Sequence, residues 1–110
     1  MKKKSWITLS VIIGTILLSI IILNHPTNSS SEEITKCIGK NSELYIQLGC
    51  HACETQEDMF GENYQYLNVI DCFYENDKCL GITATPTWII KGEKHVGVQS
   101  IEALKEFTGC

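Results

Sequence analysis

The apolar residues of this chain are arranged in two different ways. Residues 6–23 form one continuous apolar run without a charged side chain, and three lysines precede it at positions 2–4. A run of this length is sufficient to cross a bilayer as a helix. Because lysine-rich flanks stay on the cytoplasmic side, we expect residues 1–5 to be a cytoplasmic basic end and residues 6–23 a transmembrane anchor. The predicted localisation is the cell membrane, with a single pass and the rest of the chain extracytoplasmic.

A cleaved signal peptide is the alternative explanation of the same segment. The apolar run is longer than the usual core of a signal peptide, and no Ala-x-Ala-like cleavage site follows it. We therefore favour an uncleaved anchor. Residues 24–31 are polar and are expected to form a linker, so that the folded domain comprises residues 32–110.

In the domain, apolar residues alternate between the spacing of strands and that of helices. The expected elements are, in order, a short helix that begins at a Ser30–Glu33 capping box and ends at Gly39, a strand over residues 43–48, a helix over 51–60, a strand over 66–70, a loop over 71–81, a strand over 88–90, a hairpin partner over 95–98 and a helix capped by Ser100. The first strand, helix and strand have short loops, which predicts a parallel pair with a right-handed crossover. The fold class is therefore α/β.

The charge of the domain excludes some classes of partner. The chain has 13 acidic and nine basic residues, and three of the basic residues are the lysines before the anchor. The remaining part is therefore clearly acidic. This composition argues against nucleic acid and against an anionic membrane surface as partners.

The central motif is Cys50-His51-Ala52-Cys53, between a predicted strand and a predicted helix. Unpaired N–H groups and the dipole at a helix N-terminus favour an anion, so this position lowers the pKa of the Cys50 thiol. Cys53 lies one helical turn further along, where it can resolve a mixed disulfide on Cys50. His51 either carries charge and stabilises a thiolate or is an exposed histidine with little effect, and the sequence leaves both open.

The other four cysteines allow several interpretations. Cys72 and Cys79 bracket a short polar loop, and we expect a structural bridge, with a second redox pair as the alternative. Cys37 and Cys110 lie at the two ends of the domain, and because domain ends are often close, a bridge between them is plausible. Six cysteines allow 15 pairings, so the sequence alone does not determine the connectivity.

A zinc site is the alternative use of the same thiols. Cys50, Cys53, Cys72 and Cys79 together would suit a closed tetrahedral site. The position of the first pair between a strand and a helix, and the later Thr85-Pro86, disfavour this alternative. A purely structural disulfide within Cys50–Cys53 is a further alternative. We expect no metal and no bound cofactor other than the redox-active disulfide.

The order of strand, Cys-x-x-Cys helix, strand, Thr-Pro strand, hairpin and helix resembles the thioredoxin fold. The motifs that carry a more specific resemblance are Cys50-His51-Ala52-Cys53, Cys72, Cys79, Gly81-Ile82-Thr83, Pro86-Thr87-Trp88-Ile89-Ile90, Gly97-Val98-Gln99-Ser100, Glu102 and Leu104. They resemble the thioredoxin-like domain associated with bacterial and archaeal vitamin K epoxide reductase homologues, over about residues 37–108. In that family the domain is often fused to a membrane-embedded quinone reductase, whereas here we expect it to stand alone on its own anchor.

The resemblance implies a role in disulfide bond formation. The oxidised Cys50–Cys53 pair would accept electrons from thiols of exported proteins, and a vitamin K epoxide reductase-like membrane protein would reoxidise it and reduce a quinone. By position, Cys50 is the attacking or attacked cysteine, Cys53 the resolving cysteine and Pro86 a cis-proline. The backbone of Thr85 would then be presented to a substrate chain as a strand-like edge.

The chain departs from the family pattern before and within the motif. Gly49 replaces the usual aromatic residue, and His51-Ala52 replaces the common Pro-His. Leu44 occupies the position of the buried carboxylate of many thioredoxins, which favours an oxidant over a reductant. The alternatives are an exported disulfide reductase or isomerase, or a non-catalytic binding module held by disulfides or zinc.

Overall fold

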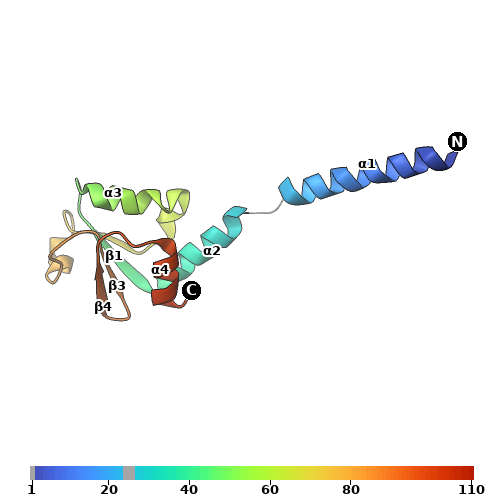
Figure 1. Ribbon diagram of the computed structural model, residues 1–110. Coiled ribbons are helices and arrows are strands. Elements are labelled where there is room, and N and C mark those ends of the chain that lie inside the picture. The colour runs from blue at the N-terminus through green and yellow to red at the C-terminus, as the bar shows by residue number, and fades with distance from the viewer. Residues whose placement is uncertain (1, 24–26) are drawn as a thin grey trace.

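The computed structural model describes residues 2–23 and 27–110. The elements are α1 (Lys2–Leu23), α2 (Thr27–Lys40), β1 (Ser42–Ile46), α3 (His51–Asp58), the 3-10 helix η1 (Gly61–Tyr66), β2 (Val69–Asp71), the 3-10 helix η2 (Asn76–Cys79), β3 (Thr87–Ile90), β4 (Glu93–Val96) and α4 (Ile101–Thr108) (Figure 1). The chain is therefore of mixed α/β class, with an apolar helix at its N-terminal end.

Helix α1 is separate from the packed part of the chain. Its segment Lys3–Ile21 is long and apolar enough to cross a membrane. Its large apolar side chains are exposed, for example Trp6 and Leu18. A helix that is apolar on all sides needs an apolar surrounding, which a bilayer supplies.

Four strands form one mixed sheet in the order β2-β1-β3-β4. Strand β1 is parallel to β2 and antiparallel to β3, and β3 is antiparallel to β4. In the central strand β1, the adjacent residues Leu44 and Tyr45 are both buried, so both faces of the sheet are covered here. The first strand ends at Ile46, at the end of the sheet opposite to α2, and from there the chain enters α3 (Figure 1).

One cluster of apolar residues forms the core. Its buried members are Ile38, Leu44, Phe60, Leu67, Trp88, Ile90 and Leu104. They come from α2, α4, the sheet and the segments around η1, so all of these elements share one core. Burial of each large side chain contributes about 1.5–3 kcal/mol, and the largest of them, Trp88, is fully buried.

Gly39 lies inside α2, and not at its end as the sequence analysis expects. The helix continues to Lys40, because η1 packs against it at this point. A Cβ atom on residue 39 would lie 2.2 Å from the carbonyl oxygen of Tyr66. Glycine is therefore required by the close approach of the two backbones, although it costs about 1 kcal/mol in a helix.

The second strand is shorter than predicted. Residues 66–70 were expected to be extended, but Tyr66 closes η1 and the strand comprises only Val69–Asp71. Leu67 is buried between them in the core, so its apolar character reflects packing of a connection and not strand pairing. Helix α3 likewise ends at Asp58, two residues before the expected end.

The hairpin is also displaced. Its second strand is Glu93–Val96, whereas residues 95–98 were expected. Lys91 and Gly92 both have positive φ, 52° and 79°, and form a two-residue turn. Such a turn joins antiparallel strands directly, so that Glu93 pairs with Ile90.

The start of α2 differs from the predicted linker. Residues 24–26 lie outside the described part of the chain, but the helix already begins at Thr27. The polar residues that suggested a linker can form the first turns of a helix. The intrinsic helix propensity of single residues is only a weak guide, and here the following segment is helical.

Candidate functional site

Cys50 and Cys53 lie where β1 turns into α3. Gly49 has a φ of +85°, which only glycine adopts readily, and this residue redirects the chain after the strand. The N–H of Cys50 donates to the carbonyl of Gln47 at 3.0 Å. Cys50 is then the N-cap of α3, so its sulfur lies beside the positive end of the helix.

The two cysteines form a disulfide and differ in accessibility. Their Cα atoms are 5.2 Å apart. Cys50 is half-buried, whereas Cys53 is only 6% exposed. The N–H of Cys53 donates to the Sγ atom of Cys50 at 3.1 Å. In the reduced protein the same N–H would stabilise a Cys50 thiolate, which is the form that attacks and leaves in disulfide exchange.

Thr85 and Pro86 form the opposite side of the site. The peptide bond between them is cis. The Sγ atom of Cys50 lies 3.5 Å from the carbonyl oxygen of Thr85. A disulfide sulfur carries no hydrogen, so this is a packing contact in the oxidised protein, and a Cys50 thiol could donate to the same oxygen once reduced. Pro86 is buried, and its carbonyl accepts a hydrogen bond from the N–H of Gly97 at 2.8 Å.

The side chain of His51 extends into solvent. Its side chain is 95% exposed, and its Nδ1 atom lies 3.7 Å from a carboxylate oxygen of Glu54. An exposed pair of this kind contributes little, and it carries charge only when the histidine is protonated. The position of His51 at the helix start is as the sequence indicates, and its effect on the thiols stays a prediction.

Asp71 holds the loop that precedes Cys50. Its Oδ1 atom accepts hydrogen bonds from the N–H of Leu48 at 3.2 Å and from the N–H of Phe73 at 2.9 Å. One carboxylate thus ties the loop after β1 to the loop after β2. Asp71 was not predicted from the sequence, where its signal is an acidic residue at the end of a strand next to Cys72.

A cavity of about 340 Å³ adjoins the disulfide on this side. Cys50, Cys53, Asp71, Glu57 and Tyr64 are among its lining residues. The hydroxyl of Tyr64 is buried and has no hydrogen-bond partner in the described part of the protein. Burial raises the pKa of Tyr64 to about 12, and the nearby carboxylates of Glu57 and Asp71 act in the same direction.

The remaining cysteines form two further disulfides. Cys37 in α2 is joined to Cys110, which follows α4, and Cys72 is joined to Cys79 across η2. These are the pairs that the sequence analysis considered. Cys72 also continues the sheet, because its N–H donates to the carbonyl of Ile46 at 2.8 Å. With Thr85 it lines a cavity of about 240 Å³.

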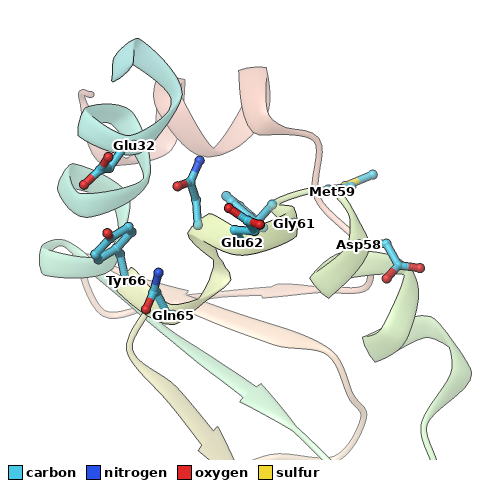
Figure 2. Close-up of a pocket in the computed structure, with 9 residues that line it drawn as sticks. Glu32, Asp58, Met59, Gly61, Glu62, Gln65 and Tyr66 are labelled. Atoms are coloured by element: carbon cyan, nitrogen blue, oxygen red, sulfur yellow. The ribbon is translucent and has the colours of Figure 1, made fainter. Parts of the chain in front are cut away.

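A larger cavity, of about 630 Å³, lies at the other end of α3 (Figure 2). Glu32 of α2, Asp58, Glu62 and Tyr66 are among the residues around it, and no cysteine lines it. Lys36 and Tyr66 bond to Glu32 and lower the pKa of its carboxyl, so this acidic residue already has partners. Size alone therefore does not identify a functional site, because the larger cavity contains no cysteine and its acidic residue Glu32 is already paired.

No known protein-family model matches the chain. Among the described residues, no group of three or more His, Cys, Asp or Glu side chains is arranged to hold a metal ion. Cys50, Cys53 and Thr85-Pro86 meet at the start of α3. This arrangement allows an accessible sulfur to be attacked while the second sulfur is shielded and serves as the leaving group.

Proposed function

We propose that this protein is a membrane-anchored thiol–disulfide oxidoreductase of the extracytoplasmic side, with a thioredoxin-like domain. The observation that carries the proposal is the disulfide at the N-terminus of α3, beside the carbonyl of Thr85. A parallel β1–α3–β2 unit followed by the β3–β4 hairpin and α4 supports the thioredoxin-like assignment. The resemblance of the motifs to the domain associated with vitamin K epoxide reductase homologues supports it from the sequence.

In the proposed reaction a partner protein is oxidised and the Cys50–Cys53 disulfide is reduced. A thiolate of the partner attacks Cys50, the Cys50–Cys53 bond breaks, and Cys53 leaves as a thiolate that takes up a proton. A second thiolate of the partner then attacks the mixed disulfide and releases Cys50 as a thiolate. The partner loses two electrons and two protons and gains a disulfide; the domain gains the two electrons, Cys53 takes up one proton, and the other proton passes to solvent.

The protein needs an electron acceptor to act repeatedly. We propose that a vitamin K epoxide reductase-like membrane protein reoxidises Cys50 and Cys53 and passes the electrons to a quinone. The apolar helix α1 supports this part of the proposal, because an anchored domain would remain close to a partner in the same membrane. The substrates would be cysteine-containing exported proteins.

Trapping of mixed disulfides tests the proposal. In Cys53→Ala the Cys50 thiolate attacks a disulfide of an oxidised partner, whose second sulfur leaves as a thiolate, and because no Cys53 is present to displace the bound partner, mixed disulfides should accumulate on a non-reducing gel. Cys50→Ala is the matched control and should trap few partners, because Cys53 is shielded. The trapped species should include exported proteins and a polytopic membrane protein.

The same experiment discriminates between the alternatives. If Cys50→Ala traps partners as well as Cys53→Ala does, the two cysteine roles are assigned wrongly. If neither variant traps a protein while both remain folded, the oxidoreductase proposal fails and a non-catalytic binding module replaces it.

A further inference from the structure

We infer that Gln56 is a positioning residue that fixes the distance between the disulfide and the Thr85-Pro86 segment, and that it is needed for reaction with polypeptide thiols but not with small thiols. The inference rests on the proposed function and deepens it. Gln56 lies on α3, one helical turn after Cys53, and is fully buried (0% exposed).

The side-chain amide of Gln56 bonds to two segments outside its own helix. Its Oε1 atom accepts from the indole N–H of Trp88 at 3.0 Å and from the backbone N–H of Gln99 at 2.7 Å. Its Nε2 atom donates to the carbonyl oxygen of Gln99 at 3.0 Å. The amide therefore pairs with both backbone groups of Gln99 in the way that a neighbouring strand would.

These two segments also hold the opposite side of the site. Trp88 follows Pro86 by two residues, in β3. Gln99 follows Gly97 by two residues, and the N–H of Gly97 donates to the carbonyl of Pro86 at 2.8 Å. A short path thus leads from Cys53 along α3 to Gln56, and from Gln56 both to Trp88 and, through Gln99 and Gly97, to the carbonyl of Pro86.

A core position does not by itself require glutamine. An apolar side chain of similar size, such as leucine, would pack there, whereas a buried amide is costly unless every polar atom has a partner. Here both amide atoms have partners, and loss of the amide would leave the buried indole N–H of Trp88 and the partly buried backbone groups of Gln99 without them. The amide therefore specifies one arrangement of α3 against β3 and the segment after β4.

The consequence differs between two kinds of substrate. A small thiol needs access only to the sulfur of Cys50, which the start of α3 provides by itself. A polypeptide thiol must also lie against the backbone of Thr85, so it depends on the distance between α3 and that segment. Misplacement of reacting groups by about 1 Å can lower a rate by up to about 100-fold.

The experiment compares the full-length protein in detergent micelles with its variants Gln56→Leu and Gln56→Glu. Glutamate retains the two accepting interactions and loses the donor to Gln99, so it is the conservative variant. Ser42→Ala is the matched control, because it removes a buried side-chain hydrogen bond, to the carbonyl of Ile38, at the opposite end of β1. Rates of disulfide reduction are measured with 2-mercaptoethanol and with a synthetic dithiol peptide. Only variants that circular dichroism shows to be folded are compared.

With the peptide, Gln56→Leu should lower the rate constant by about tenfold and Gln56→Glu by a smaller factor, in line with a misplacement below 1 Å. With 2-mercaptoethanol both variants should stay within about twofold of the original protein, and Ser42→Ala should change neither rate by more than that. Equal losses with both thiols, or an equal loss in Ser42→Ala, would assign Gln56 to general stability and overturn the inference. If Gln56→Leu does not fold, Gln56→Glu alone decides between these outcomes. A failure of the proposed function is distinct, because the original protein would then react with the dithiol peptide no faster than with 2-mercaptoethanol.

Discussion

The Sγ atom of Cys50 lies 3.5 Å from the carbonyl oxygen of Thr85, although the two residues are 35 positions apart in the chain. The contact brings the start of α3 against the segment before β3. It leaves Cys50 half-buried, with Cys53 behind it and almost fully covered. The two sulfurs of one small ring therefore face different surroundings, and their chemistry should differ accordingly.

The first prediction concerns the reduced protein. Iodoacetamide should modify Cys50 at least about tenfold faster than Cys53, because Cys50 is accessible and its thiolate accepts the N–H of Cys53. Peptide mass spectrometry of a quenched time course would measure both rates. In urea the two thiols should react alike, which is the control. Equal rates in the folded protein would contradict the asymmetry.

The second prediction is that a mild reductant opens only the Cys50–Cys53 disulfide. Cys37 lies in the last turns of α2 and Cys110 follows the end of α4, so both are near negative helix ends that disfavour a thiolate. Cys50 is at a positive helix end, which favours the reduced form.

Differential alkylation across a series of reductant potentials, followed by mass spectrometry, would show this order. Cys50 and Cys53 should be labelled first, and Cys37 and Cys110 only under strongly reducing or denaturing conditions. Labelling of all six cysteines at one potential would reject the distinction between a reactive disulfide and two structural ones.

The sequence predicted the parts of the site that depend on local structure. A strand followed by Cys-x-x-Cys and a helix fixes the position of Cys50 at the helix start, and Ser100 caps α4 by accepting the N–H of Ala103 at 3.1 Å. These features need only a few neighbouring residues. The α/β class follows from the same periodic segments.

The sequence did not predict the parts that depend on distant contacts. Gln56 in a polar stretch of α3 gives no sign that its partner is Gln99, 43 residues further along. Asp71 likewise acts on Leu48, 23 residues before it. The predicted extent of β2 was wrong for the same reason. Leu67 is apolar because it packs in the core, and in the sequence an apolar residue at this position looks like part of a strand.

The third prediction concerns the orientation of the anchor. The lysines at positions 2–4 should keep the N-terminus in the cytoplasm, with the disulfide-bonded domain outside. Full-length protein should remain in the membrane fraction at its unprocessed mass, and protease added to intact spheroplasts should degrade the domain. Replacement of the three lysines by glutamine is a useful variant, because it should weaken this preference. A shortened, soluble product from the original sequence would contradict the anchor.

The fourth prediction concerns the buried hydroxyl of Tyr64. Tyr64→Phe removes a polar atom that has no partner among the described residues, so the free energy of unfolding should stay unchanged or rise by about 1 kcal/mol. Tyr45→Phe is the matched control. The hydroxyl of Tyr45 donates to Glu43 at 2.6 Å, so its removal should lower the free energy of unfolding by about 1 kcal/mol.

The Tyr64 substitution should also change the response to alkaline pH. Burial raises the pKa of Tyr64 from 10.0 to about 12, so the folded state holds this proton more tightly than the unfolded state. The associated stability is present below pH 10 and is lost as the pH rises from 10 towards 12. Denaturant unfolding without reductant at pH 8 and pH 11 should therefore show a smaller decrease for Tyr64→Phe than for the original protein. Equal decreases in the free energy of unfolding of the two proteins would show that folding does not raise the pKa of Tyr64.

The last prediction compares the two disulfides outside the reactive site. Cys37 and Cys110 are 73 positions apart, whereas Cys72 and Cys79 are seven apart. A crosslink lowers the entropy of the unfolded chain more when it closes a longer loop. Replacement of Cys37 and Cys110 by alanine should cost about 4 kcal/mol, about 2 kcal/mol more than the same replacement of Cys72 and Cys79. A loss of that size is a large part of the stability of a domain this small.

Denaturant unfolding of the two double variants, with the Cys50–Cys53 disulfide kept oxidised in both, would measure the difference. The variant without the long-range bridge should also unfold with a steeper dependence on denaturant, because its unfolded chain is less compact and exposes more surface. The paired design controls for the two added alanines. If the two variants lose the same free energy of unfolding, the long-range bridge does not act through the unfolded chain, and its contribution lies in the packing of α2 against α4, which it joins.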